Sequence, residues 1–178
     1  MGANFNMTSK KRNNVLISFF ERFRRPAKTS AVENVTSSTA IVEEVTGTHV
    51  FKIEKFSVQK LNTKGRYIQS AIFSVGGQDW NLMYYPNGHN QAKKGYASLY
   101  LAGYKTNNVA AYWTCTVLNK KGKELWKRES SIFTFNGNSW GYHDYVDKWI
   151  LESGVSKDDC LVLKITVTVV KESLQKCV

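Results

Sequence analysis

The sequence predicts an all-β protein, an antiparallel β-sandwich of about eight strands with one short helix. From about Thr46 onward, apolar and polar residues alternate over short runs, which is typical of strands with one buried face. The chain has 178 residues, of which 42% are hydrophobic, enough to bury the core of one domain. Turn-forming residues separate the runs at Gly76-Gly77-Gln78-Asp79, Pro86-Asn87-Gly88 and Asn119-Lys120-Lys121-Gly122.

The strands are expected where β-branched and aromatic residues are concentrated. In chain order these runs are His49–Glu54, Tyr67–Val75, Trp80–Tyr85, Ala97–Ala102, Ala111–Leu118, Ser131–Phe135 and Leu161–Val170. In the last run every second residue is apolar from Leu161 to Val169, which predicts one continuously buried face. Apolar and polar residues also alternate in the first three runs, which predicts a core position for Phe51, Phe73, Trp80, Leu82 and Tyr84.

One helix is expected at Tyr142–Leu151, followed by Gly154 as a stop signal. The residues that fall on one helical stripe there are Tyr145, Val146, Trp149 and Ile150. Tyr145 and Trp149 are therefore expected to pack the helix against a sheet.

Three segments are expected along the chain: a basic, mostly disordered tail and linker at residues 1–45, the folded domain at 46–171, and a C-terminal tail at 172–178. The formal net charge is +11; residues 1–30 hold seven basic residues and one acidic residue (+6), and the other 148 residues hold 18 and 13 (+5). Apolar residues between Val15 and Phe23 recur at helical spacing beside Arg22, Arg24 and Arg25. This short basic amphipathic helix, ended by Pro26, could contact an anionic membrane, act as a targeting signal or have no role.

The sequence offers little support for catalysis or for a bound metal or cofactor. Its three cysteines, Cys115, Cys160 and Cys177, are far apart and form no CxxC motif, and its three histidines stand alone. We find no Gly-rich phosphate loop and no nucleophile elbow, so no enzyme and no cofactor are expected. Without a long apolar run or a clear secretory signal, the expected location is the nucleus, the cytoplasm or both.

Six segments from about Thr46 to Val170 resemble the MATH (meprin and TRAF-C homology) domain, in particular that of the plant MATH-BTB/POZ adaptors related to the speckle-type POZ protein. They are GTHVFKIEKFS, FSVGGQDWNLMYYPNG, YASLYLAG, TVLNKKGKE, FNGNSWGY and DDCLVLKITVTVV, in this order along the chain. The resemblance implies a TRAF-like β-sandwich that holds a short Ser/Thr-rich peptide in a shallow groove and catalyses no reaction.

The resemblance also implies a set of peptide-binding residues. Transferred position by position, they are Tyr100, Trp113, Ser130, Ser131, Phe133, Asn138, Ser139, Trp140, Gly141 and Tyr142. Alternation alone does not show which faces of the Tyr100, Trp113 and Phe133 strands are buried. Trp140, in a Gly-rich segment, is expected to be an exposed anchor. Asn138 and Ser139 stand where the family adaptors that grip serine hydroxyls carry a Lys-Asp pair, so the preferred peptide is expected to differ.

These observations predict a protein-binding module related to substrate recruitment for cullin-RING ubiquitin ligases. The sequence printed above ends at Val178 without a BTB domain, so direct cullin docking is not expected, and competition with full-length adaptors is an alternative. Another alternative is weak binding of nucleic acid or an anionic membrane through residues 10–28. Without sustained heptads, a monomer is the expected state.

Overall fold

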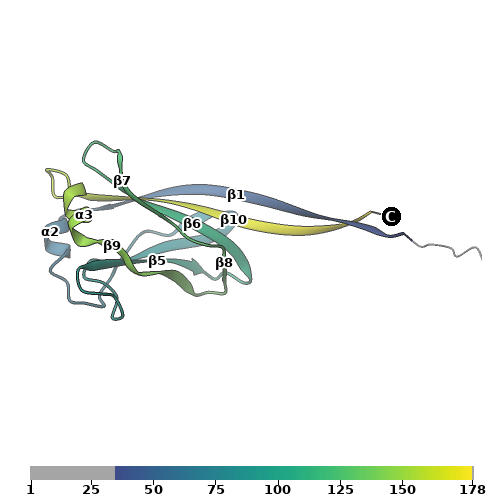
Figure 1. Ribbon diagram of the computed structural model, residues 1–178, viewed down its shortest axis with the longest axis horizontal. Coiled ribbons are helices and arrows are strands. Elements are labelled where there is room, and N and C mark those ends of the chain that lie inside the picture. Colours follow the sequence, from purple (N-terminus) through teal and green to yellow (C-terminus); the bar gives the residue numbers. More distant parts are fainter. Residues whose placement is uncertain (1–34, 178) are drawn as a thin grey trace, which may run out of the picture. The chain divides into compact units, whose positions relative to one another are not determined.

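Two antiparallel β-sheets pack face to face, and two short helices lie at one end (Figure 1). The computed structural model describes residues 35–177. The elements are β1 (Ser37–Ile53), α2 (Phe56–Gln59), β2 (Ile68–Gln69), β3 (Phe73–Val75), β4 (Gln78–Tyr85), β5 (Tyr96–Tyr104), β6 (Val109–Leu118), β7 (Glu124–Glu129), β8 (Phe133–Phe135), β9 (Ser139–Asp147), α3 (Lys148–Gly154) and β10 (Leu161–Cys177). The predicted sandwich is confirmed, although residues 35–177 form ten strands and two helices instead of about eight strands and one helix.

Strand pairing defines the two sheets. The first, which we call the β6 sheet, has the order β1-β10-β6-β7, and β8 also pairs with β6. The second, which we call the β5 sheet, has the order β2-β4-β5-β9, and β3 also pairs with β4. Strands β7, β8 and β9 therefore stand at sheet edges, where one side of the main chain pairs with no strand of residues 35–177.

The core lies between the sheets and follows the predicted alternation. In β10 the buried face consists of Leu161, Leu163, Ile165, Val167 and Val169. Trp80, Leu82 and Tyr84 of β4 are fully buried as predicted, whereas Phe51 and Phe73 are half-buried and pack against the core. Burying one large apolar side chain contributes about 1.5–3 kcal/mol, so the alternation favours this two-layer arrangement.

Strands β1 and β10 extend beyond the limits that the sequence predicts for the folded domain. Residues 37–45, assigned above to the linker, belong to β1, and residues 172–177, assigned to the C-terminal tail, belong to β10. The strands run side by side (Figure 1), and the hydroxyl oxygens of Thr46 and Thr168 lie 2.9 Å apart across them. Composition misled the prediction because main-chain hydrogen bonds, which need little buried apolar area, join two strands. The amphipathic helix expected near residues 15–25 lies outside the described residues.

The predicted helix at Tyr142–Leu151 is only half confirmed, because its first part belongs to β9 and only its second part to α3. In the pairing of β9 with β5, Tyr142 lies opposite Leu99, whereas Val146 lies opposite Ala97. This bulge interrupts the two-residue alternation of the strand. Apolar residues consequently recur at three- and four-residue spacing in β9, which imitates the pattern of a helix.

The helical part itself packs on the sandwich through Ile150 and Leu151, which are buried. Trp149, predicted to join that packing, is instead 67% exposed, because the residues before Lys148 are not helical and the stripe is shifted. Tyr145 is buried as predicted, but from β9. The two described helices, α2 and α3, are both too short to cross a membrane.

Strand β7 is missing from the sequence prediction. Its sequence, ELWKRE, is mostly charged, as is common for an edge strand, and so it lacks an apolar alternation. The turn predicted before it is present, since the Asn119 side-chain oxygen accepts hydrogen bonds from the N–H groups of Lys121 and Lys123. A tight turn directly after β6 indicates that the chain reverses and pairs with β6, so this turn could have located β7.

The strand predicted at Tyr67–Val75 is divided into β2 and β3, which both pair with β4.

Candidate functional site

The candidate site lies along one side of the sandwich, where edge strands of the two sheets face each other. β7 and β8 pair with successive parts of β6, on the side that β10 does not occupy, so they follow one another along the same edge. Across from them is β9, which pairs with β5 and with no other strand of residues 35–177. We call this line, formed by residues 124–135 and 139–147, the seam. One main-chain edge of β9 is therefore open to another strand.

At one end of the seam two aromatic rings are stacked. The rings of Phe133 in β8 and Trp140 in β9 are nearly parallel, 7° apart, with centroids separated by 4.6 Å. Trp140 is 37% exposed and Phe133 is half-buried. Because Trp140 pairs with the core residue Leu101, its side chain lies on the side of the β5 sheet that faces the β6 sheet. This pair forms an apolar platform that solvent reaches.

In the middle of the seam, Tyr142 of β9 contacts β7 across the gap between the two sheets. Its hydroxyl donates a 2.8 Å hydrogen bond to the main-chain oxygen of Glu129 in β7. The Arg128 guanidinium carbon lies 3.7 Å from the centre of the Tyr142 ring, within the range of a cation–π interaction. Behind it, the Trp113 ring lies 5.8 Å from the Tyr142 ring, centroid to centroid. Tyr142 therefore connects the edges of the two sheets.

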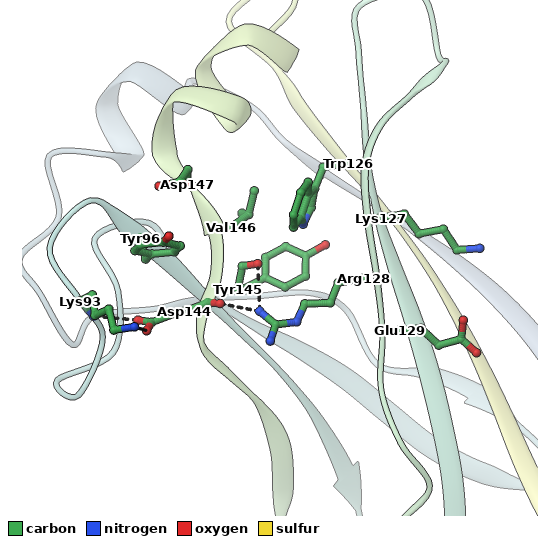
Figure 2. Close-up of a pocket in the computed structure, with 10 residues that line it drawn as sticks. All are labelled: Lys93, Tyr96, Trp126, Lys127, Arg128, Glu129, Asp144, Tyr145, Val146 and Asp147. Atoms are coloured by element: carbon green, nitrogen blue, oxygen red, sulfur yellow. Dashed lines mark hydrogen bonds and ion pairs between the residues drawn. The ribbon is translucent and has the colours of Figure 1, made fainter.

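Beyond Tyr142 the seam widens into a groove of about 650 Å³ between β7 and β9 (Figure 2). Its walls include Tyr96, Trp126 and Tyr145, and Arg128 points across it toward β9. One terminal nitrogen of Arg128, Nη1, donates to the main-chain oxygens of Asp144 and Tyr145 at 2.5 Å and 3.3 Å. The groove thus combines aromatic walls with the Arg128 guanidinium, which is held against β9.

Gly141, between Trp140 and Tyr142, allows β9 to approach β5 closely. A Cβ atom at this position would lie 2.1 Å from the main-chain oxygen of Leu99 and 2.5 Å from the Cα of Tyr100. Both are main-chain atoms that cannot move away without displacing β5. The glycine of the Trp140-Gly141-Tyr142 triplet therefore sets the position of the seam relative to the β5 sheet.

The structure brings together only some of the residues that the resemblance places in the groove. Phe133, Trp140 and Tyr142 meet at the seam, as described above. Trp113, however, has no exposed surface, and Ser130 is 7% exposed. The Ser130 hydroxyl accepts a 2.9 Å hydrogen bond from the Trp113 main-chain N–H, so both residues support the seam from behind. The expectation that they line a groove needs correction, because Trp113 lies on the buried face of β6.

The remaining polar candidates are exposed. Ser131 lies between β7 and β8, and Asn138 and Ser139 lie where β9 begins. The Asn138 side-chain oxygen accepts a 3.0 Å hydrogen bond from the N–H of Asn136, and its main-chain oxygen accepts one from Gly103 at 3.1 Å. The aromatic end of the seam is thus bordered by uncharged hydrogen-bonding side chains.

Tyr100 lies on the other face of the β5 sheet and does not reach the seam. Its neighbours Leu99 and Leu101 are fully buried between the sheets, so the alternation of β5 directs Tyr100 outward. There its hydroxyl hydrogen-bonds to Nδ1 of His143, and its ring lies 5.6 Å from that of Tyr85. Burial, reinforced by Tyr85 and Asp144, raises the pKa of Tyr100 to about 12. The expected grouping of Tyr100 with the other rings is therefore wrong for this structure.

Sequence reasoning missed Tyr96, Trp126 and Arg128. Trp126 and Arg128 belong to the strand that the prediction omitted, and Tyr96 precedes the predicted start of β5. Once β7 is placed after the Asn119 turn, strand alternation puts Trp126 and Arg128 on one face, separated from Lys127. That pattern would have identified them.

Within residues 35–177, no group of three or more His, Cys, Asp or Glu side chains is arranged to hold a metal ion. Burial raises the pKa of the Cys115 thiol to about 12, a direction that disfavours the reactive thiolate. The arrangement at the seam, an open strand edge beside aromatic rings, is suited to binding a polypeptide segment.

Comparison with known proteins agrees with this geometry. The MATH domain family model matches residues 48–167. BTB/POZ and MATH domain-containing protein 3 of Arabidopsis thaliana is 36% identical over 151 residues, which is 78% of this chain and 37% of that protein. BTB/POZ and MATH domain-containing protein 5 of the same plant is 33% identical over 148 residues, or 76% of this chain and 36% of that protein. The chain therefore spans less than two fifths of the length of these relatives.

Among solved structures, TRAF5 of Notothenia coriiceps superimposes with a TM-score of 0.55 at 16% identity, covering 68% of this chain and 72% of that one. At that identity the likeness concerns the fold, which is the predicted TRAF-like sandwich. MATH domains are protein-interaction modules, present in TRAF proteins and in plant MATH-BTB adaptors. Because the family model matches most of the chain, this protein belongs to the MATH domain family.

Proposed function

We propose that this protein binds short, extended segments of other proteins by adding them as a strand to the open edge of β9. One observation carries the proposal: β9 has a main-chain edge that no strand of residues 35–177 occupies, and the solvent-accessible Phe133–Trp140 stack lies beside it. An added strand gains main-chain hydrogen bonds that fix its register, while side-chain contacts choose among sequences.

The Phe133–Trp140 stack supports a contact with an apolar or aromatic residue of the ligand. A ring that is already held by its neighbour loses little conformational freedom on binding, and so its contact area contributes favourably. Asn138, Ser139 and Ser131 beside it are uncharged and hydrogen-bond readily, which suits a ligand with serine and threonine hydroxyls. We therefore infer a Ser/Thr-rich ligand with an apolar anchor residue.

The biological role that we propose is substrate recruitment for a cullin-RING ubiquitin ligase in the nucleus or the cytoplasm. This rests on the similarity to the BTB/POZ and MATH domain-containing proteins, which covers 78% and 76% of this chain. The seam would hold the substrate, and the ligase would be reached through other parts of the assembly.

A peptide-binding measurement with two tryptophan variants tests the proposal. The probes are fluorescein-labelled Ser/Thr-rich peptides that each contain one aromatic or aliphatic residue, and the readout is fluorescence anisotropy. We expect micromolar binding, which Trp140→Ala weakens by about 2 kcal/mol, or roughly thirtyfold. The matched control is Trp149→Ala, since Trp149 is more exposed than Trp140 and lies on α3, outside the seam.

The Trp149→Ala variant should bind like the unmodified protein. Equal binding by both variants would remove the seam from the proposal, and failure of all these peptides to bind would contradict the proposed ligand class.

A further inference from the structure

We propose that Arg128 binds an anionic side chain of the peptide, a carboxylate or a phosphate, in the groove between β7 and β9. The inference rests on the proposed peptide function and adds to it a second subsite with a defined chemistry. The first subsite, at the Phe133–Trp140 stack, is apolar, whereas this one lies on the opposite side of Tyr142 and carries a cation.

The donors of Arg128 are only partly used. An arginine has five N–H donors, two of them on Nη1. Nη1 donates to the main-chain oxygens of Asp144 and Tyr145, and one face of the guanidinium covers the Tyr142 ring. The other edge, formed by Nε and Nη2, has no acceptor among the described residues. Those two nitrogens form the fork that binds two oxygens of one anion in parallel.

The position of Arg128 also determines where an added strand has to stop. Two carbonyl groups of β9, those of Asp144 and Tyr145, already accept hydrogen bonds from Arg128. A peptide strand that pairs with the earlier residues of β9 therefore finds its next main-chain partners occupied. At that point the peptide leaves the strand edge beside the free side of the guanidinium.

The carboxylates that line the groove do not neutralise Arg128. Asp144 is paired with Lys93, whose Nζ lies 3.5 Å from one carboxylate oxygen and whose N–H donates to the other at 2.7 Å. Glu129 also lines the groove, but its side chain leaves β7 on the other side from that of Arg128, and Asp147 lies at the end of the groove next to α3 (Figure 2). No carboxylate of residues 35–173 forms an ion pair with Arg128. A ligand anion would supply the missing charge.

Two kinds of residue provide such an anion, an Asp or Glu side chain and a phosphorylated Ser or Thr. Both present coplanar or near-coplanar oxygen pairs to an arginine fork, and the phosphate carries the larger charge. The shared chemistry is an oxyanion, and the experiment separates its two sources.

The test uses a positional library of short Ser/Thr-rich synthetic peptides and the full chain. Glu, Gln, phosphoserine, Ser or Lys is fixed in turn at each position, and binding is measured by anisotropy. We expect the unmodified protein to prefer Glu or phosphoserine over Gln or Ser by about tenfold at one position. Arg128→Gln should abolish this preference, and Lys120→Gln, which removes the same charge at an exposed turn position outside the groove, should preserve it.

Arg128→Lys keeps the charge without the fork and should retain only part of the preference. If thermal unfolding shows that Arg128→Gln does not fold, the Lys variant decides. If the unmodified protein binds peptides through Trp140 but shows no preference for an anion, this inference is overturned and the proposed function stands. The same holds if the preference survives in a folded Arg128→Gln variant. Absence of binding to every peptide would overturn the proposed function as well.

Discussion

The aromatic residues of β5 and β9 are divided between two surfaces that differ in what surrounds them. At the seam, Trp140 and Tyr142 contact β7 and β8 of the opposite sheet, beside an open strand edge. On the outer face of the β5 sheet, Tyr100 contacts Tyr85 and His143, which belong to the same sheet. Trp140 and Tyr142 therefore connect the two sheets, whereas Tyr100 contacts only residues of the β5 sheet.

The difference follows from strand alternation. In the register of β5 and β9, Tyr100 lies opposite Gly141, and the residues on either side of Gly141 lie opposite core leucines. Positions that are adjacent in a motif therefore face opposite ways. At the seam, aromatic rings lie beside main-chain groups that pair with no strand of residues 35–177, and this combination is what a bound strand requires.

The largest contrast should appear in stability. Trp113 fills the core behind the seam, so Trp113→Ala should reduce the free energy of unfolding by about 3–5 kcal/mol. Tyr100 is only half-buried, and Tyr100→Ala should cost about 1 kcal/mol. Urea unfolding followed by far-UV circular dichroism measures both. Similar costs for the two variants would show that Trp113 does not have the buried position described here.

Elements with strict alternation could be predicted from the sequence, since one buried face imposes a period of two. This holds for β4, β5, β6 and the first part of β10, where predicted and observed strands overlap almost completely. The same reasoning identified Trp80 and Leu82 as core residues. The MATH resemblance, which rests on short motifs in order, supplied the sandwich and grouped Phe133, Trp140 and Tyr142, which lie along the seam.

Three features escaped prediction because their patterns do not come from burial on one face. The bulge in β9 gave Tyr142 and Val146 helical spacing, the charged edge strand β7 had no apolar stripe, and residues 37–45 are held mainly by strand pairing. Arg128 was missed together with β7. Tyr100 and Trp113 were placed in the groove by motif matching, which does not report the side of a sheet to which a residue points.

A smaller effect concerns a hydrogen bond that joins β9 to the core. The hydroxyl of Tyr145 donates a 3.0 Å hydrogen bond to the main-chain oxygen of Cys115, and both residues are buried. Tyr145→Phe should therefore reduce the free energy of unfolding by about 1 kcal/mol, since a buried carbonyl loses its side-chain donor. The control is Tyr142→Phe, whose hydroxyl bond is exposed and should contribute less. An equal loss of unfolding free energy in the two variants would mean that water reaches the Cys115 carbonyl and replaces the lost hydroxyl donor.

Alkaline pH distinguishes the core behind the seam from the outer face of the β5 sheet by titration. Burial raises the pKa of Cys115 to about 12 from 9.0, and burial together with Tyr85 and Asp144 raises that of Tyr100 to about 12 from 10.0. Above the lower values the unfolded chain releases protons that the folded protein keeps, so stability falls as pH rises. The loss should begin near pH 9 from the thiol and near pH 10 from the phenol.

Urea midpoints measured from neutral to alkaline pH check this order. Cys115→Ala should remove the fall in stability that begins near pH 9, and Tyr100→Phe should make the fall above about pH 10 less steep without abolishing it, because burial also raises the pKa values of Tyr84, Tyr85 and Tyr145. A profile that does not change in either variant would contradict both shifts.

The smallest expected effect is on peptide binding by the outer face. Tyr100 points away from the seam, on the opposite side of the β5 sheet, so a folded Tyr100→Ala variant should bind the Ser/Thr-rich probes within about twofold of the unmodified protein. Trp140→Ala should at the same time lose most of its affinity. The pair is informative because Tyr100 and Trp140 were both implied as groove residues by the same resemblance. If Tyr100→Ala abolished binding while Trp140→Ala did not, the ligand would lie on the outer face beside His143, and the open edge of β9 would have another use.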